Sequence, residues 1–249
     1  MRRVVVIISA VTLAIFGYLI YQYKVQKTEL QQLQGYQDVI NAKGELIYNA
    51  AQNWKKPIQV DLNTSELDGD YKIMADFMLN FIVESAEARN TYVRELKDKK
   101  WDHFLDVKRL ENDKKNNYQG TEVMLISVKE VMQRYQDVIE QHNEQGLKEV
   151  KKLKVNQRFR RYLRESFNET LKQNNQQHLL DYEKENFENA QKLFELLKKN
   201  EWVGRNNMFL FKSDAVAKEF NDIFKAMIEV DNKIKNVRNY NKHAIEAKL

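Results

Sequence analysis

The chain of 249 residues is 43% hydrophobic and 31% charged, and its formal net charge is +5. A length of this order suits one or two domains with a buried core. The absence of Cys excludes disulfide scaffolds, thiolate metal sites and cysteine nucleophiles, and seven Gly with one Pro are too few for the turns of a many-stranded β-sandwich or barrel.

The excess of positive charge lies at the N-terminus. Residues 1–24 contain Arg2, Arg3 and Lys24 and no acidic residue, whereas residues 25–249 carry 38 basic against 36 acidic residues. A nearly balanced charge over most of the chain is not the pattern of a duplex-binding surface. We therefore expect no nucleic-acid partner.

Residues 4–23 predict an uncleaved membrane anchor, with the lipid bilayer as a partner. This uncharged run of 20 residues would reach roughly 30 Å as a helix, which is the thickness of the hydrocarbon core. Tyr18, Tyr21 and Tyr23 gather at its end, where such rings prefer the membrane interface. The main alternative is a cleaved signal peptide, but the run is longer than usual and no small-x-small cleavage site follows it. A buried helix of a soluble protein is a third, weaker interpretation.

The flanking charges favour one orientation of this anchor. Arg2 and Arg3 precede the span, and a short tail with two arginines is hard to translocate. We therefore expect residues 1–3 to be a short cytoplasmic tail and residues 24–249 to form an extracytoplasmic helical-bundle domain. The predicted location is the inner membrane, with the bulk of the chain on the periplasmic side.

Apolar residues recur every three or four positions in most of the remaining chain, which is typical of amphipathic helices. Pro57 is expected to end the first stretch, and Ser213 is a candidate N-cap of the last. Helices joined by short polar loops predict an all-α fold, in which an N-terminal transmembrane helix is followed by an antiparallel, coiled-coil-like bundle of four to six long helices. No strand is expected, because the run 209–211 is too short. In chain order the predicted helices are 25–56, 71–97, 121–154, 156–200 and 214–247.

The residues that commonly carry chemistry do not form a recognisable catalytic or metal motif. None of the four His has an acidic residue three positions before it, and no glycine-rich phosphate loop or Gly-x-Ser-x-Gly turn occurs. His142 and His178 fall on apolar stripes, so we expect each imidazole to have a partner at the edge of the core. Acidic residues such as Glu84 and Glu87 lie among lysines, as on a solvated helix face. We therefore predict no cofactor, no metal and no enzymatic activity.

The strongest local charge bias lies in residues 148–164, where eight basic residues face one acidic residue, Glu149. An anionic lipid, an anionic glycan or the acidic face of another envelope protein would suit such a patch. The alternative is a helix end whose charge is compensated by the acidic stretch 181–195 on a neighbouring helix. The candidate patch consists of Lys148, Lys151, Lys152, Lys154, Arg158, Arg160, Arg161 and Arg164.

A second candidate is the connection 202–212, which is rich in aromatic residues where a polar loop would be expected. Its aromatic side chains either plug the end of the bundle, which we favour, or form an exposed binding patch. The candidate residues are Trp202, Asn206, Asn207, Phe209 and Phe211.

Several scattered positions resemble those of an uncharacterised family of bacterial cell-envelope helical proteins, some of which are lipoproteins. They are Pro57, Asp70-Tyr71 at the start of an aromatic-rich helix, and the block Trp202, Asn206-Asn207, Phe211-x-Ser213 and Phe220-Asn221. The resemblance spans most of residues 30–235 and implies an α-helical domain on the periplasmic side, without any catalytic residue. This chain departs from the lipoprotein members because it has no Cys to lipidate and carries a predicted spanning helix instead.

These observations predict a membrane-anchored envelope protein that acts as a non-catalytic binding or structural interaction module. One alternative is an extracytoplasmic sensor of a small ligand, which would need a partner protein because the predicted cytoplasmic tail is so short. Another, less favoured, is an enzyme that uses carboxylate chemistry inside the bundle.

Overall fold

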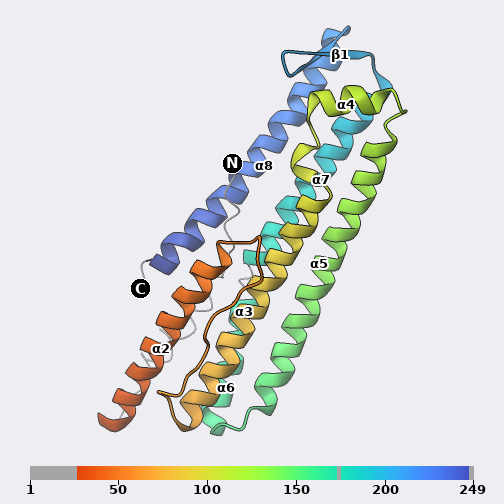
Figure 1. Cartoon of the computed structure of the whole chain (residues 1–249). Helices are drawn as coiled ribbons and strands as arrows, with labels where there is room; N and C mark the ends of the chain where they lie inside the picture. Colours follow the sequence, from red (N-terminus) through yellow and green to blue (C-terminus); the bar gives the residue numbers. More distant parts are fainter. Residues whose placement is uncertain (1–26, 173–174, 247–249) are drawn as a thin grey trace. The chain divides into compact units, whose positions relative to one another are not determined.

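The computed structural model describes residues 27–172 and 175–246, and over these residues the chain is mostly helical, as the all-α prediction requires (Figure 1). The predicted membrane span at 4–23 lies outside the described residues. None of the helices that the structure does describe combines the length and hydropathy needed to cross a bilayer. The elements are α2 (Lys27–Ala51), α3 (Gly69–Asp98), the 3₁₀ turn η1 (Trp101–His103), α4 (Val107–Lys114), α5 (Gln119–Lys152), α6 (Gln157–Lys172), α7 (Asn175–Lys199), β1 (Trp202–Arg205), β2 (Met208–Phe211) and α8 (Asp214–Glu246).

Three of the predicted helices match α3, α5 and α8 to within about two residues at each end, but other boundaries differ. The first helix ends at Ala51, before Pro57, because the chain turns there through hydrogen bonds such as that from the Asn53 amide to the Ala50 carbonyl, 3.1 Å. The stretch 156–200 is two helices, α6 and α7, rather than one. The prediction that no strand occurs is wrong, because β1 and β2 pair in an antiparallel hairpin.

The chain divides into two compact units, and both α3 and α5 contribute to each of them. Among the described residues, unit 1 contains 27–93, 135–172, 175–176 and 238–246. Unit 2 contains residues 94–134 and 177–237. Each unit has buried residues of its own and is described separately below.

In unit 1, α2 and α3 run in the same direction (Figure 1). Near their N-terminal ends, Tyr36 packs on Tyr71 with ring centroids 5.5 Å apart, and at the other end the Asn90 amide donates to the Ala51 carbonyl at 3.3 Å. The antiparallel prediction therefore does not hold for this pair. The reason is that the chain returns over the long segment 52–68 before α3 begins.

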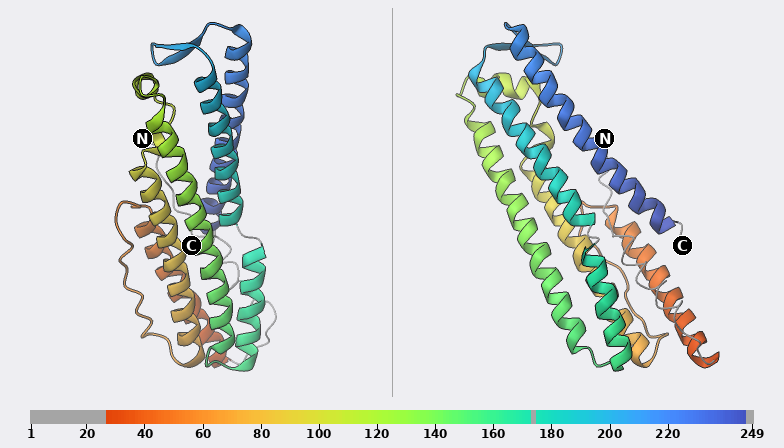
Figure 2. Two further views of the ribbon diagram at one scale, coloured as in Figure 1. Left: turned by 90° about the vertical axis from the view of Figure 1, so that its right-hand side faces the viewer. Right: turned by 180° about the vertical axis from the view of Figure 1, so that it is seen from behind.

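This returning segment lies beside α3 (Figures 1 and 2) and is fastened to the unit. Ile58, Val60 and Leu62 pack against the core, while the residues between them are exposed, so the segment has the alternation of an extended chain. The Ile58 amide donates to the Glu87 carboxylate at 2.8 Å. A long connection is thus held by both apolar and polar contacts.

The core of unit 1 joins apolar faces of α2, α3, α5 and α6. At its centre, the Phe167 ring meets the Phe81 ring edge-on, with centroids 4.6 Å apart, and lies 5.9 Å from Phe77. Phe167 is fully buried, as are Tyr36, Ile40, Ile47, Met74, Met78, Leu79 and Leu163.

Unit 2 is built on α7, which packs with the start of α5 and with α8. The Asn186 amide donates to Asp231 at 3.0 Å and Lys233 pairs with Glu185 at 3.6 Å, so polar contacts join α7 and α8. The buried apolar side chains of this unit include Leu110, Tyr118, Val128, Val131, Phe187, Leu193, Phe194, Leu197 and Val230.

Two helical glycines offer a matched test of the packing in unit 1. A Cβ added at Gly146 would lie 2.7 Å from Phe167 and 2.9 Å from Phe81, whereas one added at Gly35 would meet nothing within 4 Å. We expect Gly146→Ala to lower the free energy of unfolding by about 1–3 kcal/mol through overpacking. Gly35→Ala should raise it by about 0.5–1 kcal/mol, because Ala favours the helix. Urea unfolding followed by circular dichroism measures both, and equal effects of the two changes would contradict this packing.

Candidate functional site

The aromatic connection predicted as a candidate site is a two-stranded hairpin. Trp202 pairs with Phe211 and Gly204 with Phe209 across the strands. Asn206 and Asn207 form the turn with φ of 53° and 59°. Asn tolerates this left-handed region well, and two such residues suit a tight two-residue hairpin turn. These two asparagines therefore shape the backbone.

One face of the hairpin is turned inward and is aromatic. Trp202 is 3% exposed and meets Phe209 edge-on at 5.0 Å, while Phe209 and Phe211 both pack on Phe220 of α8, at 5.1 and 5.2 Å between ring centroids. Gly204 shares this face, and a Cβ there would come within 2.6 Å of the Glu111 carboxyl carbon. The alternation along the strands thus puts three of the predicted aromatic residues against the unit.

Polar contacts fix Trp202 in place. Its indole nitrogen donates to the Tyr118 hydroxyl at 2.9 Å and to the Leu197 carbonyl at 3.1 Å. The Lys114 ammonium lies 4.9 Å from the ring centroid and donates to the Trp202 carbonyl at 2.8 Å. The Gly204 amide donates to Glu111 at 2.7 Å. The hairpin is therefore joined to α4, to the α4–α5 turn and to the end of α7.

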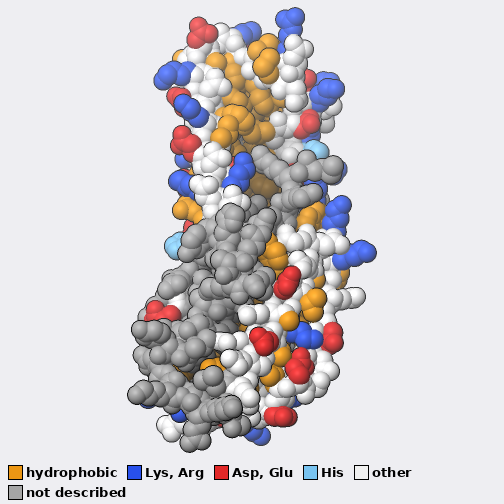
Figure 3. Space-filling model, turned by 90° about the vertical axis from the view of Figure 1, so that its left-hand side faces the viewer, with side chains coloured by type: hydrophobic (Ala, Val, Ile, Leu, Met, Phe, Trp, Pro, Cys, Tyr) orange, Lys and Arg blue, Asp and Glu red, His pale blue; other side chains and the backbone are white. Residues whose placement is uncertain are grey.

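The opposite face of the hairpin is open to solvent and mostly apolar, with Arg205 beside Met208. Val203 is 61% exposed, Met208 56% and Leu210 40%. On α8, Phe224 and Ile228 are also exposed. Figure 3 shows hydrophobic side chains gathered on one face of unit 2, with charged groups around them. The sequence analysis missed this outer face, although Asn-Asn between a run that starts with Trp-Val and the run Met-Phe-Leu-Phe is a hairpin signal.

The turn that carries Tyr118 is held by Asp113. One carboxylate oxygen accepts the Gly120 amide at 2.9 Å, and the other accepts the Thr121 amide at 2.7 Å and the Thr121 hydroxyl at 2.5 Å. Burial would raise the pKa of Asp113, but these hydrogen bonds and the nearby Arg109 guanidinium outweigh it and lower the pKa below its ordinary value. Asp113 therefore caps α5 as a carboxylate.

The basic stretch 148–164 forms the last turns of α5, the connection 153–156, called here the α5–α6 turn, and the first half of α6. Four of its eight basic residues have contacts within the chain. Lys148 pairs with Glu144 at 3.5 Å, Arg160 donates to the Val155 carbonyl at 2.8 Å, and the guanidinium groups of Arg158 and Arg161 lie near aromatic rings. The exposed side chains of Lys151, Lys152, Lys154 and Arg164 make no ion pair with any described residue.

Two acidic residues of the stretch 181–195, proposed above as the compensating partner, have partners elsewhere. Glu185 pairs with Lys233 and Glu195 with Lys199 at 3.3 Å, all within unit 2. Lys151, Lys152 and Lys154 lie exposed on the surface of unit 1.

The histidines occupy different surroundings. His142 stacks on Phe81 with centroids 4.2 Å apart, and its Nε2 lies 3.2 Å from the Phe81 carbonyl and 3.0 Å from the Ser85 hydroxyl, so it has partners at the edge of the core as predicted. His178 is exposed, which corrects its placement on an apolar face. Within 27–172 and 175–246, no three His, Asp or Glu side chains come together as metal ligands would.

A shallow hollow of about 400 Å³ lies near η1 in unit 2, where sequence reasoning predicted no site. Two of its cations have partners within the unit: Lys97 pairs with Asp102, and Arg109 donates to the carbonyls of His103 and Phe104. Lys100 is exposed at the same hollow. Its lining residues are Lys97, Lys100, Asp102, His103, Asp106 and Arg109.

Comparisons of the chain with models of protein families, with curated proteins and with solved structures found no match. The function proposed below therefore draws on the sequence and on the geometry of these surfaces.

The Asp113 cap predicts a pH-dependent stability. At neutral pH, Asp113→Asn should lower the free energy of unfolding by about 1–2 kcal/mol, because a charged acceptor of three hydrogen bonds is lost. Since the pKa of Asp113 is lowered in the folded state, its contribution is complete above the pKa of the unfolded chain and is lost as the pH falls through the folded-state pKa.

Urea unfolding of both proteins between neutral pH and about pH 3 tests this, because the difference between them should shrink below about pH 4. Asp98→Asn is the matched control, since Asp98 is an exposed carboxylate of the same unit. A difference between wild type and Asp113→Asn that stays constant over this pH range would show that Asp113 is not held as a carboxylate.

Proposed function

We propose that the chain is a membrane-anchored protein of the bacterial envelope that acts as a non-catalytic binding or structural interaction module. The observation that carries this proposal is the position of α2. Its described part, Lys27–Ala51, follows the predicted span at 4–23 within four residue steps, and its apolar stripe is buried in the core of unit 1 through Tyr36, Ile40 and Ile47. An anchor at 4–23 would therefore be joined to a packed unit by a very short connection.

The orientation proposed for this anchor places the described units on the extracytoplasmic side. It is supported by the basic residues Arg2 and Arg3 ahead of the span. The resemblance to envelope helical proteins supports the same compartment. In this arrangement the surfaces of the two units are open to lipid headgroups and to other envelope proteins.

The outer face of the hairpin is suited to binding a protein partner. Val203, Met208 and Leu210 are exposed apolar side chains on a backbone that Trp202 and Glu111 hold in place. Exposed apolar patches on a rigid support are typical of interaction sites. We propose that this face contacts another membrane protein of the envelope.

The anchor is tested by a charge at the centre of the span. Leu13→Arg should move the full-length chain from the carbonate-resistant membrane pellet to the soluble fraction, since an arginine at the centre of a helical span costs roughly 3 kcal/mol. Tyr23→Arg, at the expected interface, should stay in the pellet. Equal retention of both variants, or a mature chain whose N-terminus lies after Lys24, would contradict an uncleaved anchor.

The partner surface is tested by photo-crosslinking in intact cells. A benzophenone amino acid at Met208 should give a discrete adduct with one envelope protein, and Val203→Glu or Leu210→Glu should reduce that adduct severalfold, because a charge opposes burial of the face. Asn221→Glu, which adds the same charge at an exposed polar position of unit 2, should leave it unchanged. An adduct that survives both glutamates would exclude this face.

A further inference from the structure

One end of unit 1, called here the basal end, is defined by three contacts. Tyr71, near the start of α3, lies 5.5 Å from Tyr36 of α2 and 5.3 Å from Phe159 of α6 between ring centroids. The Asn156 amide, in the α5–α6 turn, donates to the Asp70 carboxylate at 3.0 Å. The third turn of α2, the first turns of α3 and α6, and the α5–α6 turn therefore lie together.

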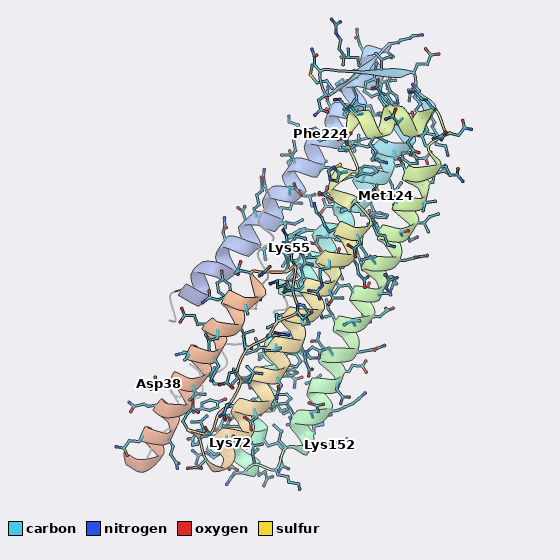
Figure 4. The ribbon with its side chains drawn as sticks, in the orientation of Figure 1. Asp38, Lys55, Lys72, Met124, Lys152 and Phe224 are labelled. Atoms are coloured by element: carbon cyan, nitrogen blue, oxygen red, sulfur yellow. The ribbon has the colours of Figure 1, made fainter. Side chains whose placement is uncertain are left out.

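The predicted anchor reaches the unit at this basal end. The predicted span finishes at Tyr23 and α2 starts at Lys27. Four residue steps extend over roughly 14 Å at most, at 3.3–3.6 Å per residue. In Figure 4, α2 runs from this end past Asp38, and Lys55 lies beyond its other end. With the anchor in a bilayer, the basal end is the part of unit 1 nearest to the lipid headgroups.

The α5–α6 turn supplies positive charge at the same place. Lys151, Lys152 and Lys154 are exposed and form no ion pair with a described residue, and Figure 4 places Lys152 at the basal end. No acidic residue occurs from 150 to 164. Lys148, Arg161 and Arg164 follow one or two helical turns further from the end.

Acidic residues also occur at the basal end, but they belong to the start of α3. Asp70 accepts the Asn156 amide, and Glu66 and Asp68 are exposed on the segment that precedes the helix. Lys72 is held by Asp76 at 3.7 Å. The end is therefore divided into an acidic side at α3 and a basic side at the α5–α6 turn.

We propose that the α5–α6 turn binds anionic phospholipid headgroups of the membrane that holds the chain. This inference rests on the proposed anchor. The potential of an anionic leaflet attracts lysines but fades within a Debye length of about 8 Å. A tether of four residue steps, roughly 14 Å at most, lets the turn come within this range repeatedly, so a weak attraction acts at a high effective concentration. The anchor and the turn together fix the orientation of unit 1 on the membrane.

The test uses the full-length chain in vesicles of phosphatidylcholine alone or mixed with phosphatidylglycerol. The chain has no Cys, so a single fluorophore is attached at Gln157→Cys, at the basal end, or at Asn53→Cys, at the opposite end of α2. A nitroxide on the lipid headgroup quenches a fluorophore that lies near it. We expect stronger quenching at residue 157 than at residue 53, an increase with phosphatidylglycerol, and a loss of this increase at high salt.

Two matched charge-reversal variants test whether the lysines of the α5–α6 turn bind the headgroups. Lys152→Glu with Lys154→Glu should reduce the quenching at residue 157 in the mixed vesicles to the level seen with phosphatidylcholine alone. Lys55→Glu with Lys56→Glu makes the same change of charge in unit 1 but just beyond the far end of α2, and should keep the quenching. Circular dichroism confirms that both variants retain their helices.

The possible failures are distinguishable. A wild-type chain that does not float with either type of vesicle contradicts the anchor and the inference together. A chain that floats with both, but is quenched equally at residue 157 with and without phosphatidylglycerol, overturns headgroup binding and leaves the anchor standing. Quenching that survives Lys152→Glu with Lys154→Glu overturns the assignment to the α5–α6 turn.

Discussion

The burial of one face of α2 in the core of unit 1 is the constraint on which the proposed function depends. Tyr36, Ile40 and Ile47 are almost fully buried, and the polar contact from Asn90 to Ala51 closes the far end of the helix. Burial of three such side chains contributes several kcal/mol, at about 1.5–3 kcal/mol each. The anchor proposed at 4–23 would therefore be coupled to a packed unit, and a force on it would be passed to the core.

In unit 2, hydrogen bonds between polar groups hold an aromatic side chain, Trp202, in place. Asp113 caps α5 and shapes the turn that carries Tyr118, and Tyr118 in turn receives the Trp202 indole. The inward face of the hairpin is thereby fixed, which leaves its apolar outer face on a rigid support. A rigid surface loses little conformational entropy on binding, so this geometry favours recognition.

The long helices could be predicted from the sequence because their apolar periodicity is strong, and three of them were placed within about two residues. The parallel course of α2 and α3 could not be predicted, since it depends on the alternation of Ile58, Val60 and Leu62 along a segment without a strand partner. The hairpin was missed because each strand has only four residues. In the candidate sites, the basic stretch and the aromatic run could be identified from the sequence. Which of their residues are exposed could not: Lys152 is exposed whereas Arg160 donates to a backbone carbonyl, and Leu210 is exposed whereas Trp202 is buried.

The most direct test of the central claim is the labelling of single cysteines in intact spheroplasts with a thiol reagent that cannot cross membranes. Because the natural chain has no Cys, any signal comes from the introduced residue. We expect Gln59→Cys, an exposed position on the segment that returns to α3, to be labelled without lysis and to remain with the membrane fraction. Labelling only after the membrane is broken, or labelled chain recovered free of the membrane, would contradict it.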